Sequence, residues 1–297
     1  DAKEWARIQV PGHWQMQGYG KPHYTDLYYP FPVDPPHVPS DNPTGCYLRE
    51  FTVAPGWKNQ QVILRFEGVD SAFHVWLNGK EVGYSQGSRL PSEFDVTELL
   101  QEGRNRLAVQ VYQWSDGTYV EDQDMWYLSG IFRDVSLIAR PKLHVRDLAV
   151  VTDLDEDFRH GVLRVRVHVE NSSAAAYDGV SVTAKLMDQS YTLVASLADT
   201  GAGELAAGQE KVVTLELPVQ EPKKWSAEEP NLYHLLLAIE QGSGEKAEVI
   251  PIRVGFRRIE VKGNNFYVNG VAIRLNGVNR HDHHPDLGRA VPLPPPA

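Results

Sequence analysis

Apolar and polar residues alternate along much of the chain, in short runs separated by Gly, Pro, Asn and Asp. In the run LRVRVHV at residues 163–169, the apolar side chains occupy one face of an extended segment and the basic ones the other. Val213, Leu215 and Leu217 repeat this spacing. A helical period is scarce. The pattern therefore predicts an all-β protein whose strands each turn one face toward a core.

Two Asn-Gly pairs mark tight turns between such runs. Asn78-Gly79 lies between residues 73–77 and 80–84, and Asn269-Gly270 lies between two similar runs. Both positions of a two-residue hairpin turn need a positive φ, which Asn and Gly tolerate. We therefore expect a β-hairpin at each pair.

The composition shifts near Arg140-Pro141, because six of the seven tryptophans precede this point. We place a first domain at residues 1–140 and a second, of the size of an immunoglobulin-like sandwich, at residues 141–254. A third part, residues 255–297, opens with the second hairpin and ends in a proline-rich tail. Proline lacks the backbone donor that a helix or a central strand needs, so we expect this tail to be extended and disordered.

Composition narrows the range of functions. Of the 297 residues, 42% are hydrophobic and 23% are charged, which is typical of a globular protein with a real core. The formal net charge of -10 and the lack of a basic stripe argue against nucleic acid as a partner. No apolar run approaches the ~20 residues that cross a bilayer, so we expect a cytoplasmic protein without membrane contact. The single cysteine, Cys46, is expected to be a small buried hydrophobe.

Several motifs in the first 140 residues resemble glycoside hydrolase family two. VPGHWQ at 10–15, YTDLYYP at 24–30 and NPTGCY at 42–47 are similar to the sugar-binding jelly-roll domain of that family. SRLPSEFD at 88–95 and WSDGTYVEDQDMW at 114–126 resemble its β-galactosidase branch in particular. The length of these matches makes coincidence implausible.

Later motifs extend the resemblance to the rest of the chain except the proline tail. WSAEEPNLY at 225–233 is similar to the sandwich domain of the family, and GVNRHDHHP at 277–285 resembles the opening strand of its (β/α)8 catalytic barrel. The resemblance thus implies a jelly-roll domain, then an immunoglobulin-like β-sandwich, then the start of a truncated (β/α)8 barrel.

The resemblance implies retaining hydrolysis of terminal non-reducing β-D-galactose residues, for example in lactose. Such enzymes use two carboxyl groups that lie only ~5 Å apart, one as nucleophile and the other as acid and base. In this family both are glutamates on later barrel strands, so we expect this chain to lack both and to be inactive alone. The resemblance also implies sodium and magnesium in the intact enzyme, with magnesium ligands outside this chain, the rest of the barrel as a partner, and a homo-oligomer.

The same motifs imply site residues. Asp26 and Asp124 would reach the mouth of the barrel and accept hydrogen bonds from galactose hydroxyl groups, and Asp124 would also help to ligate sodium. His281, the catalytic candidate, would stand at the end of the first barrel strand, where barrel active sites are built. Without the motifs, Asp26 and Asp124 would be interpreted as loop carboxylates that form Asx-turns. Trp114 and Trp126 are interpreted as core or interface anchors rather than sugar platforms.

The cluster His281-Asp282-His283-His284 has side chains that can ligate a transition metal. Strand alternation would send His281 and His283 to one face and Asp282 and His284 to the other, so a four-ligand metal site is not expected there. Two alternatives for the function stay open. β-Glucuronidase and β-mannosidase share the scaffold, although DQDMW at 122–126 favours galactosidase. The rival from another class is a stand-alone carbohydrate-binding protein in which the jelly roll serves as a lectin.

Overall fold

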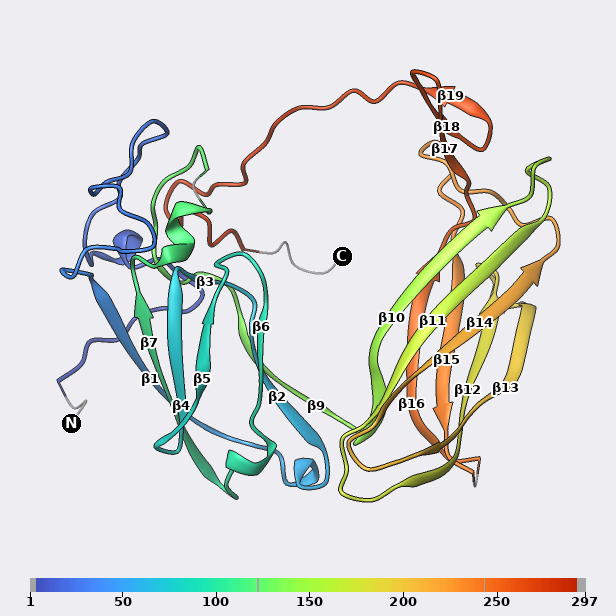
Figure 1. Ribbon diagram of the computed structural model, residues 1–297, viewed down its shortest axis with the longest axis horizontal. Coiled ribbons are helices and arrows are strands. Elements are labelled where there is room, and N and C mark those ends of the chain that lie inside the picture. Colours follow the sequence, from blue (N-terminus) through green and yellow to red (C-terminus); the bar gives the residue numbers. More distant parts are fainter. Residues whose placement is uncertain (1–3, 122, 243, 293–297) are drawn as a thin grey trace. The chain divides into compact units, whose positions relative to one another are not determined.

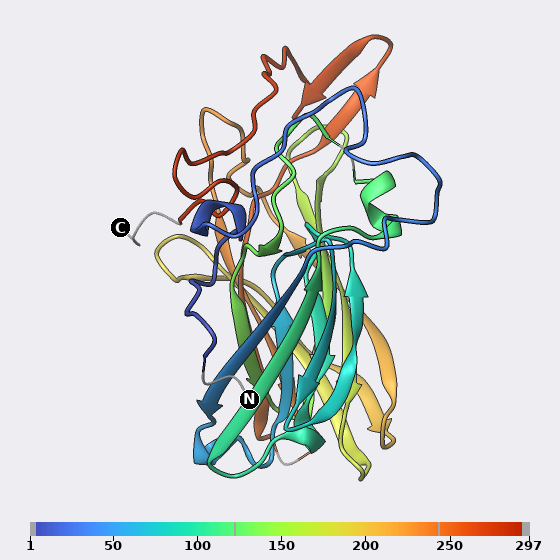
Figure 2. The same cartoon turned by 90° about the vertical axis from the view of Figure 1, so that its left-hand side faces the viewer.

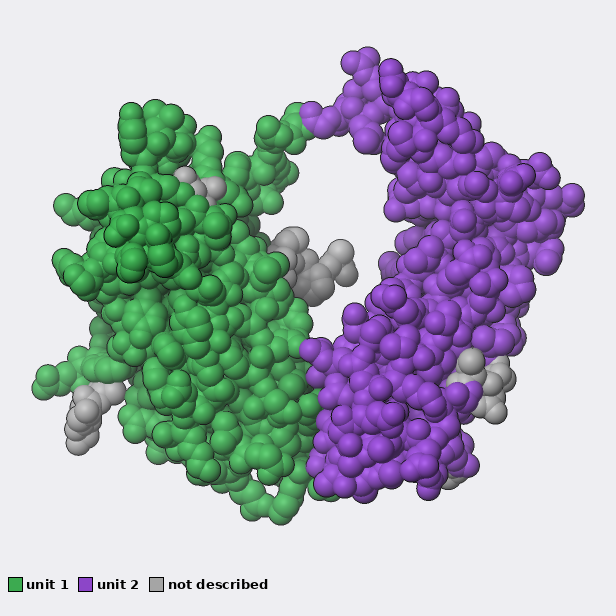
Figure 3. Space-filling model, viewed as in Figure 1, with its two compact units in different colours: residues 1–139, 278–297 green, residues 140–277 purple. Residues whose placement is uncertain are grey.

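The computed structural model describes residues 4–292 except 122 and 243, and it divides into two compact units (Figures 1 and 3). Unit 1 comprises Asp1–Ala139 and Val278–Ala297, and unit 2 comprises Arg140–Gly277. The three-part division at residues 140 and 254 stays a prediction. The end of the proline-rich tail, residues 293–297, lies outside the described residues.

The described residues form strands and short 3-10 helices but no α-helix, as the scarcity of a helical period predicted. Within the same residues, no helix is long and apolar enough to cross a membrane. The 3-10 helices are η1 (Gln15–Gln17), η2 (Pro55–Trp57), η3 (Thr97–Leu99) and η4 (Asp116–Tyr119).

Unit 1 is built from antiparallel sheets that share one core, the jelly-roll arrangement that the motifs implied (Figure 2). One sheet contains, in spatial order, β1 (Thr44–Thr52), β7 (Arg104–Tyr112), β4 (Ala72–Leu77) and β5 (Lys80–Gln86). A second contains β6 (Ser92–Asp95), β2 (Gln61–Phe66) and β9 (Val135–Arg140), and a short pair joins β3 (Val69–Asp70) to β8 (Gly130–Ile131).

Alternate side chains of these strands fill the core of unit 1. In the register of β4 and β7, Phe73 lies opposite Val111, and both are buried. Trp14 enters the same core and packs so closely on β1 that a Cβ at Gly45 would lie 2.4 Å from its ring. A side chain at position 45 would therefore displace Trp14, which gives the glycine of NPTGCY a structural reason.

Unit 2 is a sandwich of the immunoglobulin-like type that the sequence predicted. Residues 163–169 lie in β11, where their leucine and valines are buried, so this prediction is confirmed. One sheet contains β10 (Leu143–Leu154), β11 (Gly161–Asn171) and β14 (Glu210–Val219), and the other contains β13 (Leu193–Leu205), β12 (Tyr177–Met187), β15 (Tyr233–Glu240) and β16 (Lys246–Val254).

Both predicted hairpins are confirmed. Asn78 and Gly79 have φ values of 53° and 81° and join β4 to β5. Asn269 and Gly270 have φ values of 51° and 77° and join β18 (Asn265–Val268) to β19 (Val271–Ile273). Two consecutive residues of positive φ twist the turn in the sense of the flanking strands, which is why this dipeptide determines the structure locally. The strand β17 (Ile259–Lys262) pairs with β18, so that β17, β18 and β19 form a small three-stranded sheet.

Cys46 is exposed, so its predicted burial is wrong. It lies on β1, where successive side chains point to opposite faces. The neighbouring Gly45 and Tyr47 both meet Trp14, the first by close approach and the second by accepting a hydrogen bond from the indole Nε1. Cys46 therefore points away from the core. The register of the strand, not the hydrophobicity of the thiol, decides its position.

Residues 278–292 belong to unit 1, and Gly288 in this segment packs close to Met16 of η1. The strand expected at GVNRHDHHP is not formed in the described residues, because a barrel strand needs hydrogen-bonded partner strands. A turn follows in which the N–H groups of His284 and Gly288 each donate to the carbonyl of the other, at 2.8 and 3.0 Å. Gly288 has a φ of 64°, and a Cβ there would lie 2.6 Å from Leu128 and 3.1 Å from His13.

Two histidines are completely buried, one in each unit. His13 stacks on Phe132 with ring centroids 5.2 Å apart, under Gly288. Burial, with the nearby Arg289 charge, lowers the pKa of His13 to about 3. Burial, with the charge of Arg140, lowers the pKa of His144 in β10 to about 4. Both side chains are therefore neutral in the folded protein at neutral pH.

We expect Val213→Ala to lower the free energy of unfolding of unit 2 by ~2 kcal/mol, because it removes buried methyl groups and leaves a cavity. Val213 is 6% exposed. The control is Val212→Ala on the same strand, where the side chain is 48% exposed and the expected change is within ~0.5 kcal/mol. Urea unfolding followed by circular dichroism measures both. Equal losses would contradict the assigned faces of β14.

We expect acid to destabilise unit 1 between pH ~6.5 and about 3 through His13. The unfolded histidine binds a proton below ~6.5, whereas the folded one stays neutral to about 3, so each lost pH unit favours unfolding by ~1.4 kcal/mol. His13→Phe, which can stack on Phe132, should remove this contribution, and His23→Phe at an exposed position should not. Urea unfolding at several pH values, followed by tryptophan fluorescence, measures it. An unchanged pH slope in His13→Phe would refute the assignment.

Candidate functional site

The two carboxylates that the motifs singled out both lie on exposed loops of unit 1, around the phenol of Tyr24. The Tyr24 hydroxyl donates to Asp124 Oδ1 at 2.5 Å, across 100 residues of sequence. This hydrogen bond, assisted by the negative charges of Asp124 and Asp26, raises the pKa of Tyr24 to about 12. The fold thus brings Asp124 to Tyr24, which precedes Asp26 by two residues and for which no role was predicted.

The local hydrogen bonds do not favour the alternative in which these carboxylates serve as turn acceptors. In the loop at residues 25–28, the Thr25 hydroxyl accepts from the N–H of Leu27 at 3.4 Å and from that of Tyr28 at 3.2 Å. The turn is therefore held by threonine rather than by Asp26. Asp124 accepts from Tyr24, which lies on another loop.

Aromatic side chains surround the carboxylates. Trp126 lies against Tyr24 with ring centroids 5.7 Å apart, and it is 43% exposed. It is not in the core of unit 1, so of the two expected roles, core or interface anchor, only the interface role stays a prediction. Trp114 is half-buried and packs on Phe31 and Tyr127 at 5.1 and 5.6 Å. Trp114 is thus an anchor, as expected, whereas the side chain of Trp126 remains exposed.

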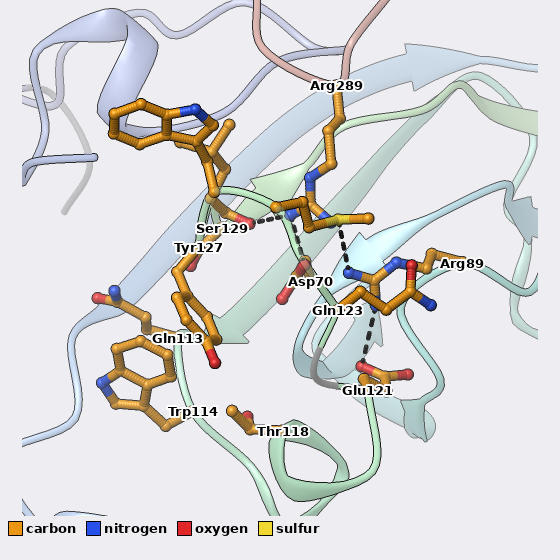
Figure 4. A pocket seen from close by; sticks show the side chains of 13 residues that line it. Asp70, Arg89, Gln113, Trp114, Thr118, Glu121, Gln123, Tyr127, Ser129 and Arg289 are labelled. Carbon is orange, nitrogen blue, oxygen red and sulfur yellow. Dashed lines mark hydrogen bonds and ion pairs between the residues drawn. The ribbon is translucent and has the colours of Figure 1, made fainter. Parts of the chain in front are cut away.

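A solvent-open pocket lies beside these residues, lined by charged, amide and aromatic side chains (Figure 4). On one wall, Glu121 accepts from the N–H and hydroxyl of Ser88, at 2.7 and 2.6 Å, and lies 3.7 Å from Arg89. Next to Arg89, Arg289 pairs with Asp70 at 2.6 Å. No motif singled out Arg289, and only the fold brings it to Asp70, 219 residues away.

His281 is exposed and lies in the segment without a strand. In the described part of the chain, no hydrogen bond or ion pair joins it to Asp26 or Asp124. Beside it, Arg280 and Asp282 form an exposed ion pair of 2.6 Å. The catalytic assignment of His281 accordingly stays a prediction.

The described residues contain no group of three or more His, Cys, Asp or Glu side chains that could hold a metal ion. Asp124 does supply the kind of donor that a hard cation such as sodium takes, a carboxylate oxygen on an exposed loop. The donor set of this chain therefore fits sodium in part. Asp124 would provide one oxygen, and the other ligands would be further oxygens.

Comparison with known families supplies the context for this site. A model of the sugar binding domain of glycosyl hydrolases family 2 matches residues 1–141, a further model of glycosyl hydrolases family 2 matches residues 143–257, and its TIM barrel domain matches residues 259–295.

Individual relatives agree with these matches. The chain is 46% identical over 292 residues to a β-galactosidase of Alteromonas mediterranea and 44% identical over 292 residues to one of Pseudoalteromonas haloplanktis. These matches cover 97% of this chain but only 28% of each relative. The crystal structure of a Bacteroides uniformis β-glucuronidase is similar with a TM-score of 0.82 at 26% identity, over 98% of this chain and 34% of that one. Since the three domain models follow one another along nearly the whole sequence, the chain belongs to glycosyl hydrolases family 2.

Proposed function

We propose that this chain serves retaining hydrolysis of terminal non-reducing β-D-galactose residues, as in lactose, by providing part of the sugar-binding surface. The observation that carries the proposal is the 44–46% identity to relatives named β-galactosidase over 97% of the chain. The similar β-glucuronidase structure is only 26% identical. Substrate class is set by a few side chains within one scaffold, so the higher identity is the better guide.

The geometry supports a role in recognition rather than in bond cleavage. Asp26 and Asp124 are exposed carboxylates, and charge-assisted hydrogen bonds from sugar hydroxyls are among the stronger polar contacts that such groups make. Trp126 places an exposed aromatic face beside them. A ring face covers the apolar C–H side of a sugar while the carboxylates bind its hydroxyls.

Bond cleavage would be carried out by glutamates of the barrel. In this chain, the family model of the barrel domain matches only residues 259–295. His281 would lie at the mouth of that barrel, and Asp124 would hold sodium beside the sugar. Magnesium would bind to ligands outside this chain. We also propose a cytoplasmic location, which fits a chain whose single cysteine cannot form an intrachain disulfide. The intact protein would be a homo-oligomer.

We expect a polypeptide limited to these 297 residues to show no turnover of a chromogenic β-galactoside above buffer, because the nucleophile and the acid/base group lie on later barrel strands. A fluorogenic β-glucuronide assayed in parallel tests the neighbouring specificity. Turnover that copurifies with the chain through repeated chromatography would contradict the proposal that this chain contributes to sugar binding and lacks the catalytic groups. A stand-alone lectin would instead bind galactosides tightly without any barrel.

We expect Asp124→Ala, in a polypeptide that carries these residues together with a complete family 2 barrel, to lower kcat/KM at least about tenfold, because a charge-assisted hydrogen bond is lost. Its response to sodium should also flatten, since the cation loses a ligand.

Asp34→Ala, at another exposed loop carboxylate, is the control and should leave both quantities unchanged. Melting temperature, measured alongside a sodium titration of kcat/KM, distinguishes this role from loop stabilisation. A sodium response equal to that of the unmodified enzyme would exclude Asp124 as a ligand.

A further inference from the structure

The loop that follows Glu121, described over residues 123–129, carries both Asp124 and Trp126, and these two side chains are exposed. Its two ends are held by backbone contacts and by a carboxylate. Glu121 is bound by Ser88, and the N–H of Tyr127 donates to the carbonyl of His23 at 2.8 Å. The middle of the loop needs another support if the exposed side chains are to keep one direction.

Met125 supplies that support, because its side chain turns inward between two arginines. Its Sδ lies 3.4 Å from Nη2 of Arg89 and 3.5 Å from Nη1 of Arg289. A thioether is a weak acceptor but a polarizable one, so two guanidinium groups on the same sulfur stabilise its position by dispersion as well as by charge. Met125 stands between Asp124 and Trp126 in the sequence, and fixing it fixes the backbone of both.

Arg289 is itself held rigidly, which a positioning group requires. Its Nη2 donates to Asp70 Oδ2 at 2.6 Å and to the carbonyl of Leu128 at 2.5 Å, inside the same loop. Its guanidinium carbon lies 5.1 Å from the centre of the Phe132 ring. The side chain is only 10% exposed, so solvent screens these contacts far less than it screens surface pairs.

Arg289 reaches this place only because residues 284–290 dock on unit 1. Gly288 approaches Leu128 more closely than any side chain would allow, and Ala290 is buried. Residues 284–290 therefore contact the loop that carries Asp124 and Trp126 at two points, Gly288 at Leu128 and Arg289 at Met125.

We propose that Arg289 and Arg89 are positioning residues that clamp Met125 and thereby orient Asp124 and Trp126, so that the recognition surface is complete only while residues 284–290 are docked. The role of Asp124 and Trp126 in sugar binding rests on the proposed function. The clamp itself does not, since it is a property of the ligand-free chain.

The test uses the 297-residue chain labelled with 5-fluorotryptophan, in which the resonance of Trp126 is assigned by its loss in Trp126→Phe. Arg289→Met should shift and broaden that resonance and leave those of the other six tryptophans in place. Amide hydrogen exchange of residues 125–129 should accelerate by about tenfold, because a charged hydrogen bond that closes the loop is lost. Arg289→Lys, which retains the charge, should restore the resonance in part.

The control is Arg65→Met. Arg65 also lies in unit 1 and is partly buried, but its ion pairs go to the carboxylates of Glu67 and Glu93, at 2.6 and 2.7 Å, and not to the loop. It should leave the Trp126 resonance unchanged. An unshifted Trp126 signal in Arg289→Met, or an equal shift in Arg65→Met, would contradict the clamp.

Titration with methyl β-D-galactopyranoside separates the two hypotheses. A shift of Trp126 in the unmodified chain that weakens in Arg289→Met supports both. No shift in the unmodified chain counts against the proposed function alone, because the clamp is already decided by the ligand-free spectra.

Discussion

Both units depend on the same constraint, that the apolar face of each sheet has to be covered by another sheet. In unit 1, Phe66 of β2 and Phe73 of β4 meet across the sheets with ring centroids 4.9 Å apart. In unit 2, Val165 and Leu215 are completely buried. Packing therefore requires apolar side chains on the inner faces of the strands, whereas it places no such requirement on the connecting loops. The exposed polar groups of the candidate site, Asp26 and Asp124 among them, accordingly lie on loops.

Much of the fold could be predicted because its signals are local. An Asn-Gly pair determines its own turn, and the alternation in β11 identifies its buried face without knowledge of the neighbouring strand. Cys46 shows the limit of this reasoning. Its side of β1 depends on Trp14, which comes from a distant part of the sequence and fixes the register by meeting Gly45 and Tyr47. A hydrophobicity scale contains no such information.

The candidate site divides in the same way. Asp26 and Asp124 stand in motifs long enough to be identified, and the structure brings both to Tyr24. Tyr24 lies in a quoted motif too, but its contact with Asp124 spans 100 residues. Arg289 had no signal at all, since it follows the motif segment and its partner, Asp70, is an ordinary residue of a two-residue strand. Contacts of this kind follow from how the chain closes on itself, and one sequence does not encode them in any pattern that can be recognised.

The direction of the Asp124 carboxylate depends on these long-range contacts more than on its own ionisation. The Tyr24 phenol is protonated at neutral pH, as an ordinary tyrosine is, and donates to Oδ1; this hydrogen bond raises its pKa to about 12. The other lone pairs of the carboxylate stay available for hydroxyl groups or a cation. An exposed hydrogen bond of this sort is screened by water and salt, so it cannot by itself fix the loop. The charges of Arg289 and Asp70 are only 10% and 16% exposed and are screened less, and Arg289 holds the backbone at Leu128. The exposed groups that would meet a ligand thus owe their geometry to a partly buried ion pair that holds the same loop.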